Sequence, residues 1–372
     1  MALLLLLTRL SVALLWFTVS GADAAVFHFP LESSPVSNSR VPVWQSDFPA
    51  ITSHENLTLY DYMDVHYYCY VQFGTPSQRI RVSLDTNLSQ VWVLNHHLGA
   101  HLFYDHNKST TYQPIGTPVD HDGYTGFVSQ DQITIGGGAL SLPHHRFVEG
   151  MTAKFGPMFK ELRYDGTIGL GLAPSPITNA PSLVPGLIQQ GLLDKPVVGL
   201  LHGKSVNGHV TIGGIDSSAY DGDLHYTPVK SPSSTSWNLP LDAVLLDGKS
   251  LAVDKIAVLA SDSPLVFGPK AEIDKIAEAA GSENLLVNCT TPGPVISFVF
   301  SGKSFTLTKD QYVYNRGVCL FGFAPNQDPN DQTWFIGGPF LRQFYTVLDY
   351  GSKGTNDPRV GFARATTHQE EA

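Results

Sequence analysis

Aspartates in two short loops are the residues of this sequence best suited to chemistry. Asp85 follows the β-rich run 79–84, and Asp262 lies in a Ser-Asp-Ser-Pro turn sequence. Two carboxylates that share one proton can hydrolyse a peptide bond, because the ionised one takes a proton from water while the protonated one polarises the carbonyl. A single carboxylate cannot fill both roles in the same step. Whether Asp85 has an acidic partner therefore decides whether this chain can perform that reaction.

The surroundings of Asp85 are echoed later in the chain. In the first half, a strand-like run, Asp85 and Trp92 are followed by Asp-Gly-Thr-Ile-Gly-Leu-Gly from residue 165. In the second half, a strand-like run and Ala260 are followed by Trp-Phe-Ile-Gly-Gly from residue 334. We therefore expect two lobes of related architecture, whose two loops face each other across a cleft.

The composition is typical of a β-rich protein with many turns. The 372 residues include 34 Gly, 25 Pro and 11% aromatic residues but only 15% charged residues, and this length can form two cores of ordinary size. Helical signals are few, at residues 181–191 and 271–280. The net charge of −10 argues against nucleic acid or an anionic membrane surface as a partner.

The N-terminal segment predicts entry into the secretory route. Residues 1–24 combine apolar runs with a small-x-small cleavage site at residues 22–24, as in a signal peptide. A signal anchor is the alternative, but Arg9 interrupts the apolar run that a membrane span needs. We therefore expect a secreted or lumenal protein, either extracellular or lysosomal.

In the secretory route, cysteines can form disulfides and asparagines can carry glycans. Cys289 and Cys319 are 30 residues apart and are expected to form a disulfide, whereas Cys69 lies in an apolar run and is expected to be a buried free thiol. Four asparagines match the glycan acceptor sequence Asn-x-Ser/Thr, and the favoured acceptors are Asn56, Asn107 and Asn288. Asn87 is the less favoured acceptor, since its loop should lie in the cleft.

From about Leu59 to Ala363 the chain resembles the pepsin-like aspartic protease family. Residues 67–78 match the family sequence Tyr-Tyr-Gly-x-Ile-x-Ile-Gly-Thr-Pro-Pro-Gln, and residues 85–93 match Asp-Thr-Gly-Ser-Ser-Asn-Leu-Trp-Val. Residues 340–363 match its C-terminal end. The resemblance implies an all-β, bilobal fold of two related β-rich lobes, with a cleft between them and a few short helices.

The resemblance also implies how the chain is divided. After the signal peptide, residues 25–55 form an N-terminal segment consistent with a short propeptide. Residues 56–195 form the N-terminal lobe, residues 196–366 the C-terminal lobe, and residues 367–372 a tail. We expect a monomer without a cofactor or a bound metal.

The loop around Ala260 differs from the family sequence at the position of the second catalytic aspartate. The family has Asp-Thr-Gly-Thr-Ser there, followed by apolar residues and Gly-Pro. Counting back from the Gly-Pro at residues 268–269 puts Ala260 at the catalytic Asp, Ser261 at the Thr and Asp262 at the Gly. Asp85 would then survive as a vestigial residue and an ordinary anion at neutral pH. Further departures near the site are Asn87, Leu88, Pro264, Pro339 and a flap hairpin that is about two residues short.

The acidic and histidine residues allow two other interpretations. Asp262 could replace the missing carboxylate, but two residues along an extended chain move the Cα by roughly 6–7 Å, so this rescue is disfavoured. The histidines and aspartates of residues 96–106 and 120–122 could hold a metal. We interpret them instead as solvated loop residues.

The resulting hypothesis is a secreted pepsin-fold protein that has lost aspartic protease activity and binds extended peptides in its cleft. One alternative is an active aspartic endopeptidase that works at acid pH with Asp85 and Asp262. Another is an interaction or inhibitory protein that uses its outer surface.

Overall fold

A computed structural model describes residues 55–62, 66–121, 124–136, 138, 140–152, 159, 162–204, 207–315, 317–351 and 357–366. The predicted signal peptide, most of the 25–55 segment, the flap tip at residues 122–123 and the C-terminal tail lie outside the described residues. In the described part of the chain no helix is long and apolar enough to cross a membrane.

Strands dominate this part of the chain, and they build three sheets. The first lobe consists of β2 (His66–Phe73), β3 (Gln78–Asp85), β4 (Val91–Leu94), β5 (Gln113–His121), β6 (Tyr124–Ile135), β7 (Leu140–Thr152) and β8 (Gly166–Gly169). The second lobe consists of β12 (Asn238–Leu246), β13 (Lys249–Leu259), β14 (Val266–Gly268), β15 (Leu286–Val287), β16 (Ile296–Phe300), β17 (Lys303–Leu307), β18 (Val313–Asn315), β19 (Cys319–Phe321), β20 (Phe323–Pro325) and β21 (Trp334–Ile336).

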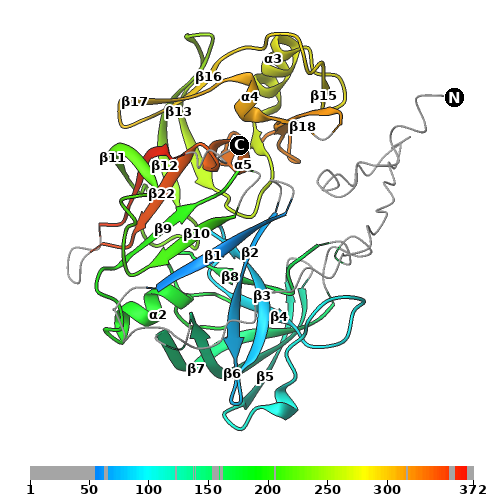
Figure 1. The fold of residues 1–372 in the computed structure, drawn as a ribbon, viewed down its shortest axis with the longest axis vertical. Helices are drawn as coiled ribbons and strands as arrows, with labels where there is room; N and C mark the ends of the chain where they lie inside the picture. The colour runs from blue at the N-terminus through cyan, green and yellow to red at the C-terminus, as the bar shows by residue number, and fades with distance from the viewer. Residues whose placement is uncertain are drawn as a thin grey trace, which may run out of the picture.

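A set of central strands lies between the two lobes (Figure 1). These strands are β1 (Glu55–Tyr62), β9 (Val197–Leu201), β10 (Gly208–Ile212), β11 (Tyr220–Pro228), β22 (Phe344–Asp349) and β23 (Arg359–Ala365). They continue into the first lobe as one sheet in the order β11-β23-β22-β9-β10-β1-β2-β3-β8-β4-β7-β6-β5. Strand β1 makes the join, because residues 55–59 pair with β10 and residues 60–62 pair with β2.

The remaining sheets belong to the second lobe. Their strand orders are β17-β16-β12-β13-β21-β14-β20 and β15-β19-β18. The helices are short, namely η2 (His106–Lys108), α2 (Leu183–Gln189), α3 (Lys270–Ala280), α4 (Lys309–Tyr312) and α5 (Gly338–Leu341). The all-β, bilobal fold with few short helices is therefore confirmed, while a lobe boundary near residue 196 stays a prediction.

The internal echo in the sequence corresponds to a repeated strand arrangement. In the first lobe, β8 runs parallel to β3 and antiparallel to β4. In the second lobe, β21 runs parallel to β13 and antiparallel to β14. The loop that follows β3 in the first lobe and the loop that follows β13 in the second lobe therefore occupy equivalent places. These are the loops of Asp85 and Ala260.

Local sequence explains several of these elements. In β3, apolar side chains alternate with polar ones before the strand becomes wholly buried at its end, next to the cleft. In α3, Ile273, Ile276 and Ala280 form the buried face, and Gly281 ends the helix with a left-handed φ of 65°. The predicted helices at 181–191 and 271–280 are both confirmed.

Two buried carboxylates organise the segment that follows β4. Asp165 is fully buried, and its oxygens accept hydrogen bonds from Arg81 Nε at 2.7 Å and pair with His101 Nδ1 at 3.0 Å. Glu149 is also fully buried and pairs with His106 Nδ1 at 2.9 Å. The expectation that the histidines of this segment are solvated is wrong for His101, which is buried, whereas His106 stays partly exposed to solvent. A buried carboxylate needs polar partners, and these two rings supply them.

The cysteines behave as the sequence indicated. Cys289 and Cys319 are joined in a disulfide with Cα atoms 5.4 Å apart, which ties β19 to the segment after β15. Cys69 on β2 is a free thiol and is completely buried. The disulfide closes a loop of 30 residues, so it restricts the unfolded chain considerably.

We predict that the double variant Cys289→Ser, Cys319→Ser loses about 3–4 kcal/mol of unfolding free energy, because its unfolded chain regains the freedom of that loop. Urea unfolding monitored by circular dichroism measures the loss. Thiol labelling of the unfolded, non-reduced wild type should modify Cys69 alone, and Cys69→Ala should show no labelling. Modification of Cys289 or Cys319 in the wild type would contradict the pairing.

Candidate functional site

Four hydrogen bonds lock the two loops together where the lobes meet. The Thr86 N–H donates to Ser261 Oγ at 3.0 Å, and the Ser261 N–H donates to Thr86 Oγ1 at 3.1 Å. The two hydroxyls then cross over, since Thr86 Oγ1 donates to the Leu259 carbonyl at 2.7 Å and Ser261 Oγ donates to the Leu84 carbonyl at 2.6 Å. Both residues are buried. We call this set the interloop lock.

The interloop lock defines which residues correspond between the two loops. Ser261 makes the same contacts as Thr86, so the residue before it, Ala260, is the counterpart of Asp85. The residue after it, Asp262, is the counterpart of Asn87. Ala260 is buried with 5% of its surface exposed, and it brings a methyl group where the other loop brings a carboxylate.

Asp85 sits at the end of β3 with only 4% of its surface exposed. Its Oδ1 accepts a hydrogen bond from the Asn87 N–H at 2.7 Å. Burial, and secondly the negative charge of Asp262, raise the pKa of Asp85 well above its ordinary value, and the Asn87 hydrogen bond offsets part of this. The upward shift of the pKa runs against the expectation of an ordinary anion, which considered only the missing carboxylate and not the burial.

Asp262 is accessible to solvent but has protein on several sides, because it lies in a pocket between the lobes. The surrounding protein displaces water and raises the pKa of Asp262 to about 6. Its charge in turn raises the pKa of Asp85. The two carboxyl groups thus interact electrostatically, although the step of two residues along the chain was expected to keep Asp262 from serving as a partner.

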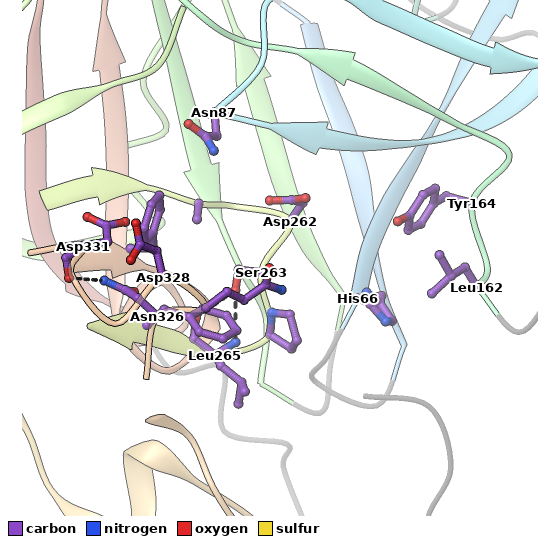
Figure 2. A pocket seen from close by; sticks show the side chains of 15 residues that line it. His66, Asn87, Leu162, Tyr164, Asp262, Ser263, Leu265, Asn326, Asp328 and Asp331 are labelled. Carbon is purple, nitrogen blue, oxygen red and sulfur yellow. Dashed lines mark hydrogen bonds between the residues drawn. The ribbon is translucent and has the colours of Figure 1, made fainter. Parts of the chain in front are cut away.

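The pocket that contains Asp262 has a volume of about 340 Å³. In Figure 2, Asp328 and Asp331 lie on one side of Asp262, and Tyr164 and His66 lie on the other. The first lobe contributes His66, Asn87, Leu162 and Tyr164, and the second lobe contributes Ala260, Asp262, Ser263, Pro264, Leu265, Phe267, Asn326, Gln327, Asp328, Asp331 and Phe335. The pocket therefore begins at the position of the missing carboxylate and extends along the second lobe.

The sequence argument missed several of these lining residues. Asp328 and Asp331 belong to an acidic turn between β20 and β21, and the only signal for them was their closeness to Trp334 in the sequence. His66 begins β2, and nothing in the sequence marks it. Burial lowers the pKa of His66 to about 4, so its ring is neutral at physiological pH.

The structure also locates the asparagines of the acceptor sequences. Asn107 and Asn288 are exposed, whereas Asn87 is half-buried and lines the pocket. The side chain of Asn56 lies outside the described residues. Glycosylation of Asn56, Asn107 and Asn288 in preference to Asn87 remains a prediction. Among the residues that the structure describes, no group of three or more His, Cys, Asp or Glu side chains could hold a metal ion.

Comparison with known proteins agrees with this geometry. Residues 66–365 match the family model described as eukaryotic aspartyl protease. Cathepsin D of Dictyostelium discoideum is 28% identical over 90% of this chain and 92% of its own length. Pepsin-2B of Gadus morhua is 30% identical over 81% of this chain and 97% of its own length. Renin of Rattus norvegicus is 28% identical over 98% of each chain. The chain belongs to the eukaryotic aspartyl protease family.

We predict that Asp85→Asn stabilises the protein at neutral pH, because a group whose pKa is raised in the folded state costs stability once it must ionise. The loss of stability begins near pH 3.8, the ordinary pKa of an aspartate, and grows as the pH rises through the raised pKa of the folded state. An asparagine does not ionise and therefore causes no such loss. The amide oxygen can still accept from the Asn87 N–H. Thermal melts should show a higher Tm for Asp85→Asn at pH 7 and the same Tm as wild type near pH 3.

The matched control for this prediction is Asp223→Asn, which removes one exposed carboxylate from β11. Its Tm should stay close to that of the wild type at both pH values, since surface substitutions usually change stability by less than about 0.5 kcal/mol. A lower Tm for Asp85→Asn at pH 7 would contradict the prediction.

Proposed function

We propose that this protein binds extended peptides in its cleft and does not cleave them by the two-aspartate mechanism. The interloop lock carries this proposal, because it makes Ala260 the counterpart of Asp85. A methyl group at that place cannot share a proton with Asp85 or help to activate water. Binding itself does not need the second carboxylate, since an extended peptide is held mainly through its backbone and through pockets for its side chains.

A second candidate function is an acid endopeptidase that uses Asp85 with Asp262. It is favoured by the electrostatic interaction of these two carboxyl groups and by the raised pKa of both. In such a pair one carboxyl can be protonated while the other is ionised, which the reaction requires. The position of Asp262 in its loop argues against this candidate. Asp262 is the residue after Ser261 of the interloop lock, whereas Asp85 is the residue before Thr86.

We also propose that the protein acts as a secreted or lumenal monomer. The disulfide between Cys289 and Cys319 supports an oxidising compartment, because disulfides are rare in proteins of the cytosol. The predicted signal peptide in residues 1–24 agrees with this placement.

The proteolysis test uses the protein purified from the secretory route and denatured protein substrates between pH 2 and pH 7. We expect no cleavage that a statin-type inhibitor blocks, because the loss of acid–base assistance alone costs about 10²–10⁴-fold in rate. An active pepsin run in parallel shows that the substrates can be cleaved. Ala260→Asp should restore at most weak activity, since Asn87 and Leu88 would still position water and substrate badly.

The variants Asp85→Ala and Asp262→Ala distinguish the two candidates. If the wild type shows acid-optimum, statin-sensitive cleavage that both variants lose, the pair of Asp85 and Asp262 is the working site and the proposal is wrong. If neither protease activity nor binding of peptides or statin-type inhibitors is found, the cleft is not the functional surface. Calorimetry with a statin-type inhibitor measures that binding.

A further inference from the structure

The described residues that line the pocket beside Ala260 include acidic side chains but no positive side chain of Lys or Arg. Asp262, Asp328 and Asp331 are the acidic ones. None of the three forms an ion pair within the part of the chain that the structure describes. Nearby, Lys255 reaches the same turn, but its Nζ donates to Gln332 Oε1 at 2.9 Å and not to a carboxylate.

Hydrogen bonds to neutral groups hold two of these carboxylates in position. Asp328 Oδ1 accepts from the Asn330 N–H, and Asp331 Oδ1 accepts from the Thr333 N–H, each at 2.9 Å. These bonds fix the side chains against the turn without cancelling their charge. The acidic groups therefore face the pocket with preset positions, which reduces the entropy that a bound cation would cost.

Two buried polar side chains in the wall of the pocket each have a polar atom without a hydrogen-bond partner. Asn326 is 8% exposed, and its Nδ2 donates to the carbonyls of Asp331 and Thr333 at 3.0 and 2.8 Å. Its Oδ1 has no hydrogen-bond partner, so an acceptor in this wall is left unused. His66 is 9% exposed and has an unpartnered Nε2. Because its ring is neutral, His66 does not offset the carboxylates.

The rest of the lining is apolar and suits the stem of a long side chain. Leu162 and Tyr164 come from the first lobe, while Pro264, Leu265, Phe267 and Phe335 come from the second. Lys and Arg bury their methylene stems along apolar surface and keep the charged group near polar atoms. A cavity of about 340 Å³ with apolar walls and an acidic end offers both environments.

We propose that this pocket selects a lysine or arginine side chain of the bound peptide. The inference rests on the proposed peptide-binding function and adds the class of peptide that the cleft prefers. Asp328 and Asp331 are its specificity-determining residues. They attract the cationic end of the side chain, and Asp262 adds its charge at the end of the pocket beside Ala260.

The test retains a random octapeptide library on the immobilised full-length mature protein at pH 7.5 and low salt, and quantifies the bound peptides by mass spectrometry. We expect Lys and Arg to be enriched about tenfold over the input at one position of the bound peptides, since each exposed or half-buried ion pair contributes up to about fivefold. The enrichment should shrink as salt is raised to about 0.5 M, because the charges are partly exposed to solvent.

A matched pair of double variants separates this pocket from the net charge of the protein. Asp328→Asn with Asp331→Ser keeps at each position an oxygen that can accept from the turn but removes two charges, and it creates no glycan acceptor sequence. It should reduce the enrichment to about threefold or less. Asp221→Asn with Asp223→Asn removes two exposed charges from β11 and should leave the enrichment unchanged.

The two proposals can fail separately. Peptides retained without enrichment of Lys and Arg, or an equal loss of enrichment in both double variants, would overturn the inference and leave peptide binding in place. If no peptide is retained by the wild type, the proposed function fails and the inference fails with it.

Discussion

The hydrogen bonds between Thr86 and Ser261 are the constraint on which the site depends. Each loop supplies both a donor and an acceptor to the other, and each hydroxyl also bonds to a carbonyl of the opposite loop. These groups are buried, so breaking one bond would leave a polar atom without water or protein as a partner. The two lobes are therefore held in one register, and the pocket between them has a defined shape.

The same interaction explains how the scaffold can persist without the chemistry. None of the four bonds involves the side chain of residue 260, so alanine there removes no support from the loops. The charge balance does change, since Asp85 stays buried and no carboxyl group stands at its counterpart. Its hydrogen bond from Asn87 compensates only part of the cost of burial, so the pKa of the carboxyl group stays above its ordinary value.

Electrostatics gives the cleft its individual character. Asp85 is enclosed, Asp262 is accessible within the pocket, and Asp328 and Asp331 lie on the acidic turn beside it. The histidine in the wall stays neutral because burial lowers its pKa. An acidic pocket with apolar walls is thus combined with a backbone framework that belongs to the aspartyl protease family.

The sequence by itself determined the features that depend on neighbouring residues or on order along the chain. These include the short strands, the helix that ends at Gly281, the two related lobes and the pairing of Cys289 with Cys319. In each case the signal is a local periodicity, a turn residue or a spacing, and these can be recognised from the order of residues along the chain.

Only the tertiary structure decided which charged groups meet. His101 is paired with Asp165, which is 64 residues further on, and the charge of Asp262 acts on Asp85 across the interface of the lobes. Asp328 becomes part of a pocket because the strands next to its turn pack beside the loop of Ala260. Burial, pKa and pocket lining depend on atoms from several distant segments, and no pattern within a short stretch of sequence records them.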